Sequence, residues 1–349
     1  MEKVIVYNAT TGKELLWRSI KIRKSLDEIC HTLELELSPS EKAKVKRHNR
    51  LKVICANRLD RDFGGKRCIT TVLVDEVTSS ADISKSCLMV LGRSPARDII
   101  DSVWSDHDDF SFASFDTEQT LKMIATKIAE KFNIRCDTFG YEGVDDPTEI
   151  VPYFLFENES PWTKLIDEAD NQGYIFTSNE EGNLYLWKAG AGNRPEPFYI
   201  TEGINARNIR WTENGAEQFH EYVLKGMSGS VHIIDNTCPG NRVLNIVIID
   251  PFVDEEKLRR RAEVEMHRRQ GDKVTVTVSG LGLTDAQIES LGDTTGKEIY
   301  WSPNLLIPVR IPSLGLNKKL LISEVEYKVD AEAMSCDLTL VNREEYVCE

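Results

Sequence analysis

The sequence lacks the features that mark several common classes of protein. It has no tract rich in glycine or proline, and 41% of its 349 residues are hydrophobic, so a folded chain of two or three domains is expected. It contains no apolar run long enough to cross a membrane. Because a strand pattern begins directly at Met1, without a signal peptide, we expect a soluble protein that is made in the cytoplasm and does not insert stably into membranes.

Positive charge is also in short supply. Lysine and arginine together number 43 against 57 aspartates and glutamates, which gives a formal net charge of -14. A general nucleic-acid binder needs a basic face that displaces counterions from phosphates, so the charge balance argues against that function. The eight cysteines include no CxxC pair, which removes the spacing of a zinc ribbon and favours buried cysteines in a reducing compartment.

The first part of the chain has the pattern of short strands. Leu33, Leu35 and Leu37 alternate with glutamates, and residues 68–74 are rich in strand-forming side chains. Such strands, separated by turn signals, predict a first β-barrel domain over residues 1–93.

Helical patterns replace the strands over residues 94–192. One helix is predicted from residue 95 to about residue 106, and a second is expected to begin behind Asp116 as its N-cap. A third helix lies between Ser160-Pro161 and Gly173, in the usual order of cap, proline and terminal glycine. A hairpin over residues 174–188 completes a small mixed α+β domain.

Strands return over residues 193–349. Valines alternate with threonines from residue 274 to residue 278, and a second alternation runs from residue 305 to residue 311. One helix interrupts them around residues 254–270, capped by Asp254, with glutamates in its first turn and arginines in its last. A second β-barrel domain with an inserted helix is predicted.

The two predicted β-domains contain a short internal echo. Residues 66–77 and 86–93 resemble residues 318–325 and 335–343, and Asp82 corresponds to Asp330. The match needs one inserted residue, so duplication and coincidence both stay open. Duplication would place two related β-domains on either side of the mixed domain.

No motif in the sequence indicates a catalytic, cofactor-binding or metal site. The six histidines are scattered without metalloprotease spacing. A glycosidase needs two carboxylates on facing walls of a cleft, and the clusters at Asp106, Asp108 and Asp109 and at Asp145 and Asp146 are better explained as solvated loops. We therefore expect no catalytic residue, no cofactor and no metal, and the protein is not expected to be an enzyme.

The densest basic run after residues 42–50 is Lys257-Leu258-Arg259-Arg260-Arg261. It could contact DNA, but the interleaved glutamates favour a helix surface with Glu255–Arg259 and Glu256–Arg260 pairs at spacing four.

Several stretches resemble one known family. Residues 181–188 (Glu-Gly-Asn-Leu-Tyr-Leu-Trp-Lys) resemble the G-x-L-x-L hairpin that closes the middle domain of Mu-like phage tail hub proteins. Residues 200–206, onward to 222–226, are similar to the first strands of their second barrel, and residues 301–341 look like its end. The resemblance spans essentially the whole chain and includes the hubs of contractile phage tails and of related secretion machines.

The resemblance implies a structural baseplate hub located in the virion tail. Its fold would be mainly β, with two similar β-barrel domains flanking the mixed domain. Three chains would form a ring that joins the six-fold tail tube to the three-fold spike, and a doubled barrel gives a homotrimer quasi-six-fold symmetry. The implied partners are the tail spike protein and the tail tube or other baseplate proteins, while DNA passes through the channel without specific binding.

Two other functions compete with the hub. One is a tail-associated peptidoglycan hydrolase, which the aspartate clusters motivate, and the other is a soluble carbohydrate-binding β-protein.

Overall fold

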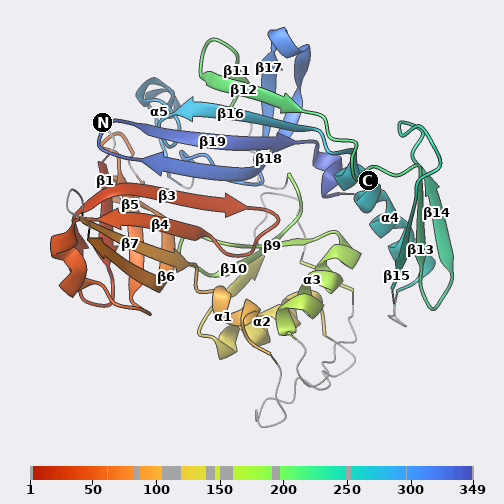
Figure 1. Cartoon of the computed structure of the whole chain (residues 1–349), viewed down its shortest axis with the longest axis horizontal. Helices are drawn as coiled ribbons and strands as arrows, with labels where there is room; N and C mark the ends of the chain where they lie inside the picture. The colour runs from red at the N-terminus through yellow and green to blue at the C-terminus, as the bar shows by residue number, and fades with distance from the viewer. Residues whose placement is uncertain are drawn as a thin grey trace.

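The computed structural model describes residues 3–60, 62–81, 86–103, 119–138, 146–149, 160–190, 197–248, 253–295 and 297–347. Its architecture is mainly β, as the sequence predicts (Figure 1). The described strands form one sheet of 13 strands and two sheets of three strands. Long strands of the large sheet run across the molecule, and the helices between residues 97 and 172 lie below them in this view (Figure 1).

The N-terminal strands form what we term the first half-sheet. They begin where the alternation of apolar and polar residues begins, and their apolar members are buried. The elements are β1 (Lys3–Asn8), β2 (Lys13–Leu15), β3 (Trp17–Ser25), β4 (Thr32–Leu37), η1 (Pro39–Lys44), β5 (Arg50–Ala56), η2 (Asp62–Gly65), β6 (Lys66–Ala81) and β7 (Ser86–Arg93).

The helical segment that follows is the mixed unit, described over parts of residues 94–190. Its core is formed by the apolar faces of two helices against a three-stranded sheet of order β8-β10-β9. The elements are α1 (Arg97–Ile100), α2 (Leu121–Lys131), β8 (Cys136–Thr138), α3 (Pro161–Gln172), β9 (Ile175–Ser178) and β10 (Leu184–Trp187). The predicted hairpin is confirmed, with β9 and β10 antiparallel.

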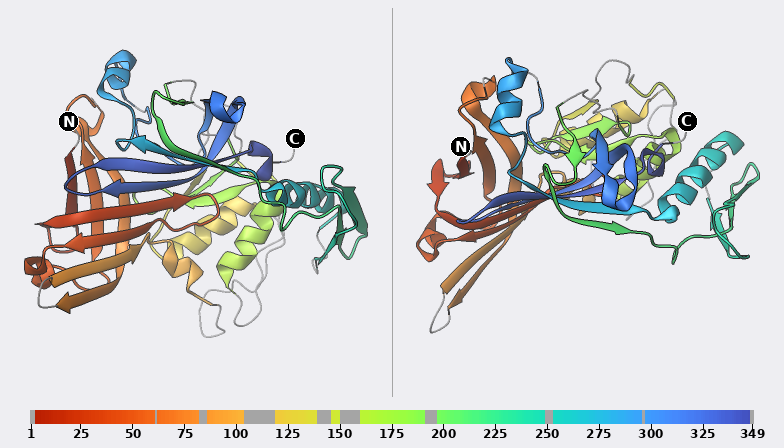
Figure 2. Two further views of the ribbon diagram at one scale, coloured as in Figure 1. Left: turned by 45° about the horizontal axis from the view of Figure 1, so that its top comes forward. Right: turned by 90° about the horizontal axis from the view of Figure 1, so that it is seen from above.

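The rest of the chain forms the second half-sheet and a lobe. The second half-sheet contains β11 (Ile200–Thr201), β12 (Ala206–Thr212), β16 (Lys273–Ser279), α5 (Asp285–Leu291), β17 (Leu306–Ile311), η3 (Pro312–Leu314), β18 (Leu316–Val329), β19 (Met334–Val341) and η4 (Arg343–Glu345). The lobe, residues 213–272, contains β13 (Glu221–Lys225), β14 (Ser230–Ile234), β15 (Val243–Val247) and α4 (Glu255–Gln270). It stands at one end of the molecule (Figures 1 and 2).

The two half-sheets repeat one pairing scheme. In chain order, β1, β3, β4, β5, β6 and β7 correspond to β11, β12, β16, β17, β18 and β19, and every pairing of the first set recurs in the second. The long hairpins β6–β7 and β18–β19 even share an irregularity: the register shifts between Val74 and Glu76 and between Ile322 and Glu324. These positions match in the internal echo, which favours duplication over coincidence. One pairing differs, since β1 is antiparallel to β5 and β11 is parallel to β17.

One hydrophobic core extends through both half-sheets. It includes Val6, Leu35 and Val90 from the first and Val276, Ile307 and Leu338 from the second. The mixed unit and the lobe each have a separate core. The half-sheets are therefore joined by a shared interior, whereas the two appended units keep their own.

Several expectations need correction. Over the described residues the large sheet is continuous and open, with β12 and β2 at its ends, so two closed barrels are not seen. The helix predicted from residue 95 to about residue 106 ends at Ile100, and Val103 is exposed. Asp116 lies outside the described residues, and the hydroxyl of Thr120 caps α2 instead. The similarity of residues 222–226 to a barrel strand was misleading, because β13 belongs to the lobe.

Candidate functional site

The two half-sheets meet at one seam, formed by β3 and the C-terminal half of β18. The strands are antiparallel, with Ile20–Ser25 opposite Glu324–Val329. Because side chains alternate across a strand, Ile22 and Tyr327 point into the core, and Arg23 and Glu326 point outward. The hydroxyl of Tyr327 donates a hydrogen bond to the carbonyl of Trp301 below the sheet.

Opposite charges line the outer face of the seam. Arg23 contacts Glu324 at 2.8 Å, and Lys21 contacts Glu326 at 3.0 Å. Burial raises the pKa of Glu326, but hydrogen bonds from Lys328 and Lys21 outweigh it and hold the pKa below its usual value. These side chains are partly exposed, so each pair adds only tenths of a kcal/mol, up to about 1 kcal/mol. The charges favour this strand pairing without dominating its stability.

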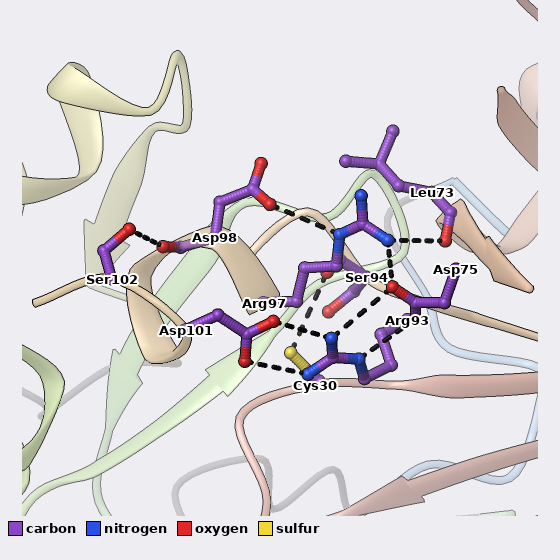
Figure 3. Close-up of polar contacts among 9 residues, drawn as sticks. All are labelled: Cys30, Leu73, Asp75, Arg93, Ser94, Arg97, Asp98, Asp101 and Ser102. Atoms are coloured by element: carbon purple, nitrogen blue, oxygen red, sulfur yellow. Dashed lines mark hydrogen bonds and ion pairs between the residues drawn. The ribbon is translucent and has the colours of Figure 1, made fainter. Parts of the chain in front are cut away.

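The mixed unit is fixed to the first half-sheet by a network of aspartates and arginines (Figure 3). Asp75, the residue at the irregularity of β6, contacts both Arg93 and Arg97. Arg93 also contacts Asp101 at 2.7 Å, and Arg97 donates to the carbonyl of Leu73 at 3.4 Å. An extra residue in one strand re-aims its side chain, which accounts for the position of Asp75 between two arginines.

Burial and charge reinforce each other in this network. The Arg97 side chain is only 8% exposed, so its guanidinium depends on partners that replace water. Hydrogen bonds from Arg93 lower the pKa of Asp101, while those to Asp101 and Asp75 raise the pKa of Arg93. Nearby, burial raises the pKa of Cys30 to about 11, so this thiol stays protonated. The network therefore holds the mixed unit against the first half-sheet, and the protonated thiol of Cys30 is not an activated nucleophile.

A second polar contact links the turn before β6 to the second half-sheet. Arg67 donates to the carboxylate of Asp60 at 3.0 Å and to the carbonyl of Thr294 at 3.1 Å. The hydroxyl of Thr294 completes the triangle by donating to Asp60 at 2.8 Å. Asp60 and Thr294 are buried, so the contact is shielded from water and salt.

A cavity of about 500 Å³ lies where the two half-sheets and the mixed unit meet. Its lining includes Lys24 of β3, Glu180 of the β9–β10 turn, and Glu298 and Tyr327 of the second half-sheet. The Lys24 side chain is 3% exposed and contacts Glu180 at 3.0 Å. Burial and the nearby Glu180 raise the pKa of Glu298, whose carboxylate accepts the backbone N–H groups of residues 299 and 300.

Buried His31 lies close to the same charges. Burial and the positive charge of Lys24 lower its pKa well below the usual value, so the ring is neutral at physiological pH. Its Nδ1 lies 3.2 Å from the hydroxyl of Thr70. These groups are engaged with the protein itself, and the arrangement holds three parts of the chain in one orientation.

The predicted carboxylate clusters are only partly within the described residues. Asp106, Asp108, Asp109 and Asp145 lie outside them. Asp146 contacts Lys122 at 2.7 Å, and hydrogen bonds from Lys122 and Thr138 lower its pKa. A general acid requires a raised pKa, so the environment of Asp146 does not favour glycosidase chemistry.

The basic run of α4 has a role that the sequence did not reveal. The predicted Glu255–Arg259 and Glu256–Arg260 pairs are present, each at 3.5 Å. Other cations of α4 reach the mixed unit: Lys257 contacts Glu149 at 3.2 Å, and Arg261 contacts Asp167 of α3 at 3.5 Å. Charge thus attaches the lobe, which has its own core, to the body of the protein.

The described part of the chain contains no group of three histidine, cysteine, aspartate or glutamate side chains that could hold a metal ion. Within the same residues, no helix is both long and apolar enough to span a bilayer.

The sequence matches no protein-family model and no curated protein. Its structure is nevertheless similar to solved tail proteins. The 43 kDa tail protein of prophage MuSo2 from Shewanella oneidensis has a TM-score of 0.77 at 21% identity, over 99% of each chain. A tail protein from Neisseria meningitidis has the same TM-score and coverage at 15% identity.

A more distant similarity extends to secretion machinery. The Escherichia coli c3393 protein, a component of the type VI secretion system with structural similarity to the T4 bacteriophage tail proteins gp27 and gp5, has a TM-score of 0.57 at 9% identity. The match covers 100% of this chain and 79% of that one. The chain therefore has the fold of the Mu prophage tail proteins, and the family resemblance seen in its sequence is confirmed at the level of the fold.

Proposed function

We propose that this protein is the structural hub of a contractile tail baseplate. Three copies form a ring that joins the six-fold tail tube to the three-fold spike and surrounds the DNA channel. One observation carries the proposal: a fold shared with tail proteins over nearly its whole length contains two copies of one strand-pairing scheme. A chain with two equivalent modules lets three copies present six equivalent positions.

The proposed domains follow the same division. Residues 1–93 and 193–349 are two barrel-like domains, and residues 94–192 are the mixed domain between them. Each half-sheet supplies the curved wall of one barrel. The partners are the tail spike protein and the tail tube or other baseplate proteins, and the site of action is the tail baseplate of the virion.

The charge of the chain suits a conduit for DNA. A formal net charge of -14 repels phosphates on balance, which favours passage of DNA without tight binding. The basic side chains of α4 do not contradict this, because Lys257 and Arg261 contact carboxylates of the mixed unit. We propose a structural, non-enzymatic role on this basis.

Sedimentation equilibrium at micromolar concentration tests the proposal. We expect three times the mass of one chain. A monomer at every concentration would contradict the ring, and clearing of a peptidoglycan zymogram by the purified protein would favour the hydrolase alternative.

A further inference from the structure

At the seam, one edge of β18 pairs with β3, and the equivalent edge of the corresponding strand β6 is open in the described part of the chain. The first half of β18 pairs with β17, and its second half, Glu324–Val329, pairs with β3. The corresponding strand β6 pairs with β5 only through Leu73. The N–H and carbonyl of Val74 still bond to Asn49 and His48. Among the described residues, no strand pairs with the same edge of β6 beyond Val74, although β7 covers the other edge as far as Ala81.

The other side of the seam has an open counterpart too. β3 lies between β4 and β18, whereas its counterpart β12 pairs with β16 and, within the described residues, has no second neighbour. Exposure follows the same difference. Tyr327 and Ile22 are buried at the seam, whereas on the open edges their counterpart Ser79 is exposed and their counterpart Trp211 is only partly buried. Each chain therefore has one occupied seam and both halves of a second, unoccupied one.

We propose that the open edge of β12 pairs with residues 76–81 of β6 in a second copy of this chain. The pairing would repeat, between chains, the contact that β3 and β18 make within one. The inference rests on the proposed function for the number of copies in the ring. Its choice of partner rests on the structure, because the two complementary edges are found on the same chain.

The echo and the strand registers fix how the two edges align. The register shifts equate Glu76 with Glu324, so Thr78 corresponds to Glu326. On the other side of the contact, β12 corresponds to β3 and β16 corresponds to β4. Lys273 begins β16 as Thr32 begins β4. Thr212 pairs with Lys273 and Arg23 pairs with Thr32, so Thr212 is the counterpart of Arg23. Since Glu326 lies opposite Arg23, Thr78 of one copy lies opposite Thr212 of the next.

The side chains have the alternation that this register requires. On β12, Ile209 and Trp211 pack against the large core, and Arg210 and Thr212 point outward. On β6, Val77 packs against the same core, and Thr78 is exposed. Apolar positions of both strands therefore fall on one face when Thr78 and Thr212 are opposite. A slip of one residue would place Val77 on the opposite face of the sheet from Ile209 and Trp211.

The contact is heterologous, because it joins different edges of the two copies. Heterologous contacts generate a closed ring when the rotation between copies closes, and an open filament when it does not. Pairing also removes two exposed strand edges, which are otherwise sites of aggregation. In a ring of copies joined in this way, seams within one chain alternate with seams between neighbouring chains.

Disulfide cross-linking of the full-length protein tests the register. Thr78→Cys and Thr212→Cys are combined in one chain and oxidised at micromolar concentration. Directly opposite residues have Cβ atoms close enough for a disulfide, so we expect covalent oligomers on non-reducing gels. The matched control is Ser79→Cys with Thr212→Cys, which is slipped by one residue, and its yield should be about tenfold lower.

Single variants distinguish the two edges. Thr78→Cys mixed with Thr212→Cys should give covalent dimers, whereas each variant alone should stay uncross-linked. These positions also avoid Cys87, which lies opposite Ser80 and could form a bond within the chain.

Five outcomes decide the proposal. Cross-linking of the matched pair alone supports it. Equal cross-linking of the slipped pair overturns the register, and cross-linking of either single variant with itself overturns the heterologous contact. A particle of three chains that lacks the matched cross-link overturns the strand pairing and leaves the hub proposal standing, while a monomer without cross-links overturns both.

Discussion

Replacing Glu345 with glutamine should stabilise the protein, and more so as the pH rises. Glu345 lies in η4 near the C-terminus, where its carboxyl is buried and accepts the backbone N–H of Asn342. Burial raises its pKa to about 7, and the nearby Asp27 and Asp272 act in the same direction. The folded protein therefore keeps this proton at a pH where an unfolded chain has lost it.

The sign of the effect follows from the two pKa values. Below the usual glutamate value of 4.5, the side chain is protonated in both states and costs nothing. Between 4.5 and about 7 the folded state binds more protons, so stability falls as the pH rises. Above that range the full cost is present, with an upper limit of about 3 kcal/mol that residual solvent screening reduces to about 2 kcal/mol.

Urea denaturation near pH 5 and near pH 8 measures this cost. Glu345→Gln should gain about 2 kcal/mol over the wild type at the higher pH and less than about 1 kcal/mol at the lower. Glu344→Gln is the matched control, since Glu344 is exposed in the same turn, and it should change stability little at either pH. Equal behaviour of the two variants, or a gain that does not grow with pH, would refute the reasoning.

Three further predictions concern two of the junctions and one close backbone contact inside the second half-sheet. Asp75→Asn should lower the free energy of unfolding in urea by about 2 kcal/mol, because it leaves the buried Arg97 without its main carboxylate, whereas exposed Asp98→Asn should cost under about 1 kcal/mol. Gly282→Ala should cost at least about 2 kcal/mol in the same assay, because its Cβ would lie 1.9 Å from the carbonyl oxygen of Ile299. Raising NaCl to about 0.5 M should speed amide exchange in α4 more than in β18, because screened ion pairs attach the lobe; equal protection at low and high salt would contradict this.

Local patterns in the sequence determined most of the elements. The caps and terminal charges of α4 fixed both of its ends, and the alternation in β4, β5 and β16 identified strands with buried faces. The internal echo also pointed to a real repeat of strand pairing. These features depend on residues close together in the chain, where periodicity and capping carry the information.

Features that depend on long-range packing were missed. The helix predicted after Ser94 ends at Ile100, and Arg97 and Asp101 make long-range contacts with Asp75 and Arg93 that no local pattern predicts. Nothing local marks Asp75 as a junction residue, except that a carboxylate interrupts a strand of apolar side chains. The basic run of α4 was explained within its own helix, because its partner Asp167 lies about ninety residues earlier in the sequence.

The two half-sheets are alike, but the units attached to them, the lobe and the mixed unit, differ. This difference suggests how one chain could connect a six-fold partner to a three-fold partner. The connection between β3 and β4 spans only residues 26–31, whereas the corresponding connection between β12 and β16 contains the entire lobe. After β7 the chain enters the mixed unit, whereas β19 is followed by the short helix η4, whose Glu345 accepts a hydrogen bond from Arg268 of the lobe. In the proposed ring, the repeated strands would therefore present six similar surfaces, which a six-fold tube can contact equivalently. The lobe and the mixed unit would each occur three times, at alternate positions. A partner that binds these units would therefore be arranged with three-fold symmetry.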